Sequence, residues 1–171
     1  SVEYFNAYPL PHSEGVYRGS REVEPDKRVF ILSRAYFAGQ QRAGAAFWSG
    51  DIVPRWDDFR EQISGLVNAS MAGAPNVSFD IGGFSPERRY ETKDPAHLPE
   101  WRELNLRWFQ HGAFVPIFRL HGQFPYREIW EIAPEGTPHY ASFVHYLKLR
   151  YTLLPYVYTL AGGTWHGDGT M

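Results

Sequence analysis

With 171 residues, the chain is long enough for one domain with a sizeable hydrophobic core. Its 17 Lys and Arg residues and 19 Asp and Glu residues are spread along the sequence, so it lacks the basic stripe of a nucleic-acid-binding protein. No cysteine is present to form a disulfide or a thiolate metal site, and no apolar run is long enough to span a bilayer. We therefore expect neither nucleic acid nor a membrane as a partner.

The first 28 residues predict a short or broken helix followed by a turn. Apolar residues recur between Glu3 and Tyr17, but Pro9 and Pro11 interrupt them, and proline removes a backbone donor from a helix. Polar residues around Glu22 to Lys27 indicate the turn.

Two short strands are predicted next. Residues 28–33 contain a continuous apolar run that is typical of a strand buried on both faces, and Arg34 follows it. A loop rich in Gly, Gln and Ala, residues 35–44, leads to a second strand at Ala45 to Trp48. This strand runs into a glycine and then Asp51, the pattern of a buried strand that presents a carboxylate at the edge of a cavity. An aspartate after a strand is also common as a turn former or helix cap.

A helix and a third strand follow. Asp57 or Asp58 is predicted to cap a helix whose apolar residues fall on one face, and Gly73 is predicted to end it. A strand from Val77 to Phe79 begins a few residues later. Asp80 comes directly after this strand and precedes a pair of glycines. Asp80, like Asp51, is therefore a carboxylate at the end of a predicted strand.

The remainder of the chain predicts two further helices around a fourth strand. After a long polar loop, a proline opens a helix, and a strand from Phe114 to Phe118 begins soon after that helix. Arg119 and His121 follow this strand. Another long loop precedes a helix from about Pro138 to Ala161, which Pro155 should kink.

The alternation of strands and helices predicts an α/β fold with a parallel sheet. Loops after strands are long and carry the charged residues, which is typical of a (β/α)8 TIM barrel with its active site at the carboxyl ends of the strands. An open, doubly wound sheet places its site at the same ends and is the alternative. Four strands and three helices are about half of a closed barrel. We therefore expect residues 1–171 to form half a barrel, with bare edges on its first and last strands.

The strand ends would bring six side chains around one cavity: Arg34, Trp48, Asp51, Asp80, Arg119 and His121. One interpretation is metal-assisted hydrolysis with Asp51, Asp80 and His121 as ligands, although no second histidine accompanies them at a strand end. Phosphate binding by the glycine pair after Asp80 is a weaker interpretation, since neither a lysine nor a spaced third glycine accompanies the pair.

Glycoside hydrolysis fits these residues better. It needs two carboxyl groups flanking a glycosidic oxygen, one protonated to assist the leaving group and the other ionised. Trp48 beside Asp51 could supply the apolar surroundings that keep a carboxyl protonated near neutral pH. Arg and His side chains would bind sugar hydroxyls, and the aromatic residues, 17% of the chain, suit the faces of sugar rings.

Four motifs of the chain occur in the order and approximate spacing of glycoside hydrolase family 31, which holds α-glucosidases, α-xylosidases and related transglycosylases. They are Ser33-Arg34, Trp48-Ser49-Gly50-Asp51, Asp80-Ile81-Gly82-Gly83-Phe84 and Arg119-Leu120-His121. The resemblance covers nearly the whole chain. Within the family, residues 88–107 and 124–130 are most similar to the bacterial α-xylosidases.

The resemblance implies a role for each matching residue. Asp51 would be the general acid/base, which protonates the glycosidic oxygen and later activates water. Arg34 and His121 would bind hydroxyls of the sugar in the -1 subsite. Trp48 and Phe84 would line that subsite.

Asp80 and Arg119 would be charged neighbours that orient one another and tune the acid/base. Two plainer interpretations remain open for them, namely a cap or turn after a strand for Asp80 and a structural ion pair for Arg119. The resemblance implies neither a metal nor a cofactor.

One departure from the family bears on activity. The family's catalytic nucleophile is an Asp on the fourth strand, in a Trp-x-Asp-x-x-Glu type motif, and none of the strands predicted from the sequence carries such a motif. The chain is therefore interpreted as strands five to eight and their helices, the carboxyl-terminal half of the catalytic barrel. Its expected partners are an oligosaccharide substrate and the remaining half of the barrel, because a retaining mechanism cannot run on Asp51 alone.

The resemblance predicts part of a retaining hydrolase that removes terminal α-xylosyl or α-glucosyl residues from oligosaccharides by double displacement. An α-glucosidase or α-transglucosylase of the same family is an alternative. A non-catalytic unit that binds sugar or assists assembly is another, and the metal-dependent hydrolase is a third.

Overall fold

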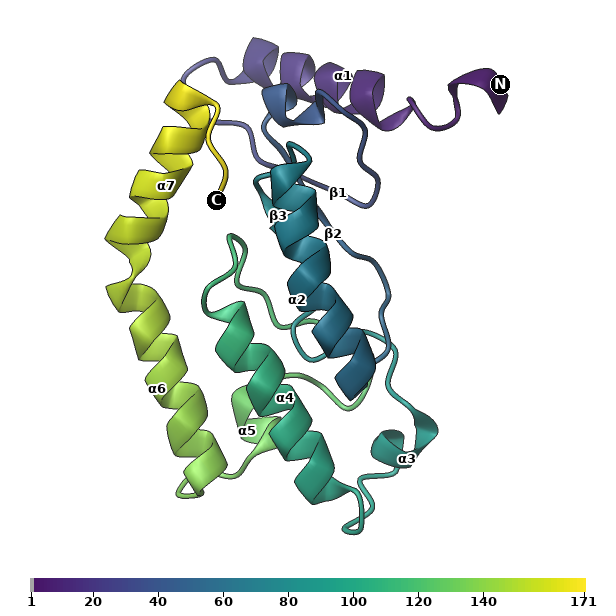
Figure 1. Ribbon diagram of the computed structural model, residues 1–171, viewed down its shortest axis with the longest axis vertical. Helices are drawn as coiled ribbons and strands as arrows, with labels where there is room; N and C mark the ends of the chain where they lie inside the picture. Colours follow the sequence, from purple (N-terminus) through teal and green to yellow (C-terminus); the bar gives the residue numbers. More distant parts are fainter. Residues whose placement is uncertain (1) are drawn as a thin grey trace.

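A computed structural model describes residues 2–171 as a short parallel sheet and a set of helices (Figure 1). The strands are β1 (Ile31–Ser33), β2 (Ala45–Trp48) and β3 (Val77–Ser78). The α-helices are α1 (Pro9–Val23), α2 (Trp56–Met71), α3 (Arg88–Glu91), α4 (Leu98–Gly112), α5 (Ile129–Ile132), α6 (Pro138–Thr152) and α7 (Leu154–Gly167). Two 3-10 helices are η1 (Val2–Tyr4) and η2 (Gln40–Ala43).

The sheet is parallel, as predicted, and its strands lie in the order β1-β2-β3. Ile31 pairs with Ala45, and Phe47 pairs with Val77. A further parallel bridge joins Ile81 to Leu120, so a fourth segment lies beside the third in sequence order. A doubly wound sheet reverses its strand order at a switch point, whereas a barrel adds strands in sequence, so this order favours the barrel.

The fourth strand predicted at Phe114 to Phe118 is wrong, since only the Leu120 bridge forms there. Pro116 has no backbone N–H to donate to a ladder. The guanidinium of Arg150 donates to the carbonyl oxygens of residues 113, 115 and 116, which removes acceptors that a strand would use. The Ser78 hydroxyl donates to the Ile117 carbonyl oxygen at 2.8 Å. Side chains therefore replace the ladder along this segment.

The helical stretch over Glu3 to Tyr17 is broken, as predicted, but the break lies at residues 5–8, between η1 and α1, and not at the prolines. Pro9 and Pro11 lie in the first turn of α1. Residues in that turn have no intrahelical acceptor for their N–H groups, so proline costs no hydrogen bond there. The two prolines therefore begin the helix that they were expected to interrupt.

The predicted cap of α2 is also wrong. Arg55 occupies the N-cap position, and Asp57 and Asp58 lie inside the first turn, where their charges favour the helix dipole. The end of the helix is as predicted, because Gly73 follows it with φ +89°.

The carboxyl-terminal helix divides as the proline predicts. The predicted helix from Pro138 to Ala161 is α6 and α7, which meet at Leu153, two residues before Pro155. The two long loops predicted at residues 85–97 and 122–136 contain the short helices α3 and α5. Within residues 2–171, no helix combines the length and the hydropathy that crossing a bilayer requires.

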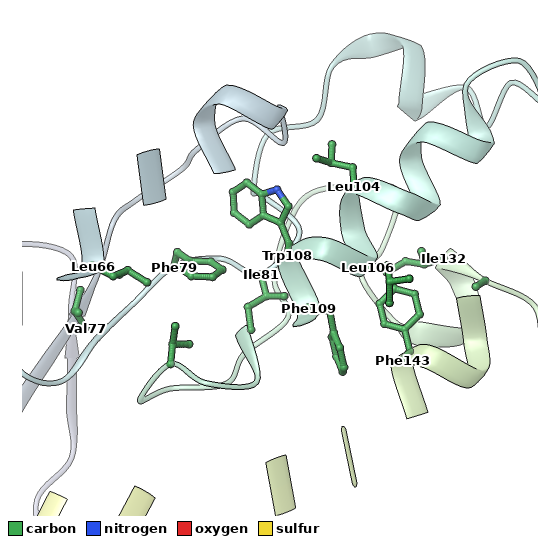
Figure 2. Packing of buried hydrophobic residues seen from close by; sticks show 12 residues of the cluster. Leu66, Val77, Phe79, Ile81, Leu104, Leu106, Trp108, Phe109, Ile132 and Phe143 are labelled. Atoms are coloured by element: carbon green, nitrogen blue, oxygen red, sulfur yellow. The ribbon is translucent and has the colours of Figure 1, made fainter. Parts of the chain in front are cut away.

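The core forms between the strand ends and α4, which lies between α2 and α6 (Figures 1 and 2). The buried Trp108 ring stacks on Phe59 with centroids 5.3 Å apart and meets Phe79 edge-on at 5.4 Å. Phe109 meets Phe143 edge-on at 5.0 Å. These contacts fix the helices on the sheet and so hold the loops at the carboxyl ends of the strands.

Candidate active site

The loops after β1 and β2 present an ion pair at the carboxyl end of the sheet. Arg34 donates from Nη1 to Oδ1 of Asp51 at 3.1 Å, and its Nη2 lies 3.0 Å from Oδ2. Gly50, with φ +89°, makes the turn that places Asp51 after β2. The hydrogen bond to Asp51 raises the pKa of Arg34 above its ordinary value. Both side chains are exposed, Arg34 to 64% and Asp51 to 37%, so a ligand can reach the carboxylate.

Trp48, the last residue of β2, lies near two guanidinium groups. The Cζ atoms of Arg34 and Arg119 lie 5.8 Å and 5.7 Å from the centroid of its ring. Both distances are within the range of cation–π attraction. The indole Nε1 is buried and has no acceptor among the described residues. The ring therefore joins the β1 and β2 loops to the segment that carries Arg119.

Asp80, which follows β3, is fully buried and paired with Arg119. Nη2 of Arg119 donates to Oδ1 of the carboxylate, and Oδ2 has no partner within residues 2–171. Burial raises the pKa of Asp80 above its ordinary value, and the nearby positive charge of Arg119 acts in the opposite direction. The ion pair predicted from the sequence is present, and Asp80 is not merely a turn residue.

Phe84 and His121 form the other side of the site. Their ring centroids lie 5.4 Å apart. Phe84 N–H donates to the Ile52 carbonyl oxygen, and Gln123 N–H donates to the Phe84 carbonyl oxygen, both at 2.8 Å. The loops after β2, after β3 and after the Leu120 bridge are thereby tied to one another. Each of the seven predicted side chains lies at the carboxyl end of a strand, next to the Leu120 bridge or on the loop that follows.

The glycine pair after Asp80 makes a close turn and offers no phosphate cradle. Gly82 and Gly83 have φ +91° and +69°, and a Cβ on Gly83 would lie 2.7 Å from Pro54. The Gly83 N–H donates to the Asp80 carbonyl oxygen at 2.8 Å, so this donor is not free for an anion. The pair therefore serves close packing between the loops.

Sequence reasoning missed Arg127, which lies between His121 and α5. It reads as an ordinary charged loop residue, but its side chain is buried and only 3% of the residue is exposed. The guanidinium donates to the carbonyl oxygens of Gly82, Gly83 and Gln123 at 3.0, 2.8 and 2.9 Å. No local pattern in the sequence marks it, since its acceptors are backbone groups that any residue would supply.

The described residues contain no group of three or more His, Asp and Glu side chains that could hold a metal ion. Both carboxylates of the supposed metal set already bind guanidinium groups, Asp51 that of Arg34 and Asp80 that of Arg119. The residues present therefore form paired charges and aromatic faces, an arrangement suited to a neutral, polyhydroxylated ligand.

A parallel sheet built in sequence order, with charged and aromatic side chains at the carboxyl ends of its strands, defines part of a TIM-barrel domain. A family model described as the glycosyl hydrolases family 31 TIM-barrel domain matches residues 1–160. The chain belongs to glycosyl hydrolase family 31, and the resemblance seen in its motifs is confirmed.

Relatives of the chain include α-glycosidases from an archaeon and a solved bacterial structure. An α-xylosidase of Saccharolobus solfataricus is 42% identical over 163 residues, 95% of this chain and 21% of the relative. An α-glucosidase of the same organism is 34% identical over 158 residues, 91% of this chain and 21% of the relative. The crystal structure of an α-xylosidase from Xanthomonas citri is 68% identical, with a TM-score of 0.96 over 98% of this chain and 18% of that chain. The chain thus spans about a fifth of the length of these relatives.

Proposed function

We propose that the chain is part of a retaining α-glycoside hydrolase that removes terminal α-xylosyl residues from oligosaccharides. Two observations support this proposal: the exposed carboxylate of Asp51 lies among aromatic and cationic side chains, and the two α-xylosidases described above are more similar to the chain than the α-glucosidase described beside them. The identities to the two α-xylosidases, 68% and 42%, against 34% for the α-glucosidase favour the xylosyl sugar.

In this proposal Asp51 is the general acid/base. In the first step the carboxylate of the nucleophile, supplied by the other half of the barrel, forms a bond to C1 of the sugar as the bond from C1 to the glycosidic oxygen breaks. The electron pair of the broken bond stays on that oxygen, and the carboxyl proton of Asp51 moves to it. In the second step the carboxylate of Asp51 takes a proton from water, whose oxygen attacks C1 and displaces the nucleophile. The Arg34 pair supports this role because it orients the carboxylate and leaves it accessible.

The remaining site residues bind the sugar. Arg34 and His121 donate to hydroxyls in the -1 subsite, and sugar hydroxyls take over the guanidinium of Arg34 when the substrate arrives. Trp48 and Phe84 line the subsite, since each packs against a polar site residue. Asp80 and Arg119 pair with each other and orient one another, and the guanidinium of Arg119 holds the indole of Trp48.

The nucleophile comes from a second half of the barrel. In our proposal residues 1–171 are the carboxyl-terminal half, with β1, β2, β3 and the Leu120 segment as strands five to eight. Within the described residues β1 pairs on one side alone, which leaves an edge for a strand that carries the nucleophile. The share of the relatives that the chain spans agrees with this assignment.

An activity assay on the complete enzyme, with both halves present, tests the proposal. We expect hydrolysis of an α-xyloside to exceed that of the matching α-glucoside, with full activity in a metal chelator. Preference for the glucoside would select the α-glucosidase or α-transglucosylase alternative. Sugar binding without hydrolysis would select the non-catalytic alternative, and loss of activity in the chelator would select the metal-dependent one.

A further inference from the structure

Arg127 joins two loops of the site that are distant in the sequence. Its Nε and Nη2 donate to the carbonyl oxygens of Gly82 and Gly83, in the turn between Asp80 and Phe84. Its Nη1 donates to the carbonyl oxygens of Gln123 and Pro125, in the loop after His121. One guanidinium thus binds both sides of the Phe84–His121 contact.

The surroundings hold this guanidinium in one place. Its Cζ lies 4.6 Å from the centroid of the buried Trp101 ring on α4. Burial lowers the pKa of Arg127 to about 10, so the side chain is still charged at neutral pH. Planar guanidinium has five donors in fixed directions, a geometry that the single ammonium of lysine does not reproduce.

Two glycines make room for the guanidinium and the loops around it. A Cβ on Gly122 would lie 2.6 Å from the Gly83 carbonyl oxygen and 2.8 Å from Nη2 of Arg127. A Cβ on Gly82 would lie 2.8 Å from Cδ of Arg127. The two loops approach each other at glycine residues, which have no side chain to keep them apart. Among the described residues, Arg127 is the one cation that donates hydrogen bonds to both loops.

We infer that Arg127 is a positioning residue, which sets Phe84 and His121 at the distance from Asp51 that sugar binding requires. The inference rests on the proposed function. Arg127 itself need touch no substrate, because it acts through the backbone of the two loops. Its loss should disturb the -1 subsite and leave the proton transfer of Asp51 chemically intact.

A second buried arginine provides a matched control. Arg150 is 7% exposed and donates to three backbone carbonyl oxygens, those of residues 113, 115 and 116. It therefore resembles Arg127 in burial and in its acceptors, but it ties α6 to the segment before Phe118. Arg150→Lys should cost stability in the same way without moving the two site loops.

The experiment compares Arg127→Lys, Gly122→Ala and Arg150→Lys in the complete enzyme. Gly122→Ala keeps every charge and forces the same two loops apart, because its Cβ would collide with the Gly83 carbonyl oxygen and Arg127. It therefore replaces Arg127→Lys as the test if that variant does not fold. Thermal unfolding gives stability, and calorimetric titration with a non-hydrolysable thioglycoside gives affinity and counts competent sites. Rates are then expressed per competent site on an activated aryl glycoside and on a disaccharide.

For Arg127→Lys or Gly122→Ala we expect at least a tenfold loss of kcat/KM per competent site, equal on both substrates, with weaker thioglycoside binding. For Arg150→Lys we expect a lower unfolding temperature and a kcat/KM per site within twofold of the parent. Parent-like kcat/KM per site in the Arg127 and Gly122 variants would overturn the inference alone. A parent enzyme that neither binds nor cleaves the sugars would overturn the proposed function, and the inference with it.

Discussion

The two ion pairs at the carboxyl end of the sheet differ in burial, and that difference separates their proposed roles. Asp51 and Arg34 are exposed to 37% and 64%, so water or a sugar hydroxyl can replace either partner. Asp80 is fully buried and Arg119 is 28% exposed, so the carboxylate loses its charged partner without gaining water if the pair is broken. The exposed pair is therefore suited to change during a reaction, and the buried pair is suited to stay fixed.

The substitution Arg119→Met tests the structural role of the Asp80–Arg119 pair. It leaves the Asp80 carboxylate buried without its cation, and we expect a loss of about 3 kcal/mol in the free energy of unfolding at pH 7. Because the pKa of Asp80 is raised in the folded state, the carboxyl stabilises the fold when protonated, and this stability is lost as pH rises from its ordinary pKa through the raised one. The deficit of the variant should therefore shrink at acid pH. Urea denaturation of the complete enzyme and its variant across that pH range measures the deficit.

Glu131→Ala is the control for that measurement. It breaks the exposed Lys93–Glu131 pair, whose side chains are 46% and 40% exposed. Such pairs contribute less than about 1 kcal/mol, so the stability should change little and without the same pH dependence. Equal losses in the two variants would contradict the assignment of Asp80 and Arg119 as a buried structural pair.

At the scale of the element, the sequence predicted those parts that depend on local pattern. The apolar runs before Arg34 and Asp51 predicted β1 and β2, and Pro155 predicted the break between α6 and α7. The fourth strand was wrong because Arg150, 34 residues beyond Pro116, takes the carbonyl oxygens of that segment. Contacts so distant in the chain leave no mark in a local pattern.

Replacing glycine by alanine should change the stability in opposite directions in the turn after Asp80 and in α7, and two substitutions test this. Gly83→Ala places a Cβ against the backbone of Pro54 at a positive φ, so we expect a loss of about 2 kcal/mol or more. Gly163→Ala lies within α7, where a Cβ would meet nothing within 4 Å, and should add about 0.5–1 kcal/mol. Thermal unfolding of the complete enzyme carrying each substitution gives the sign of each stability change. A stabilising Gly83→Ala would contradict the close turn after Asp80.

For the site, the charged residues at the strand ends could be predicted from the sequence. The hydrogen bonds that hold the site loops in place could not. Asp51, Asp80 and Arg119 were identifiable because each follows an apolar run, and charge at that position is informative in any parallel sheet. The pairing of Asp51 with Arg34 and the burial of Arg127 depend on how loops fold over one another. Neither property follows from the type of the residue or from its neighbours in the chain.

At the scale of the whole molecule, apolar surface remains exposed on elements at its margins. Phe30, beside the unpaired edge of β1, is 70% exposed, and Tyr158 and Trp165 of α7 are 69% and 68% exposed. Figure 1 shows α6 and α7 as an arm along one side of the molecule, and Phe30 lines one cavity with Val157 and Tyr158 of α7. In a closed barrel the remaining elements would cover this apolar surface, which agrees with the proposed half.

The isolated 171 residues should therefore be poorly folded. We expect size-exclusion chromatography to give aggregates and calorimetry to give no cooperative transition. The other half of the barrel, supplied as a second polypeptide, should restore a soluble complex. A monodisperse, cooperatively unfolding chain that binds sugar alone would contradict this prediction and favour the non-catalytic alternative.

The most direct test of the account is Asp51→Ala in the complete enzyme, assayed on two glycosides that differ in leaving group. General acid catalysis contributes about 10²–10⁴-fold, and a poor leaving group needs the proton most. We predict a loss of that size on a disaccharide and a much smaller loss on an activated aryl glycoside. Equal losses on both substrates, or no loss on either, would contradict the role of Asp51 as the acid/base.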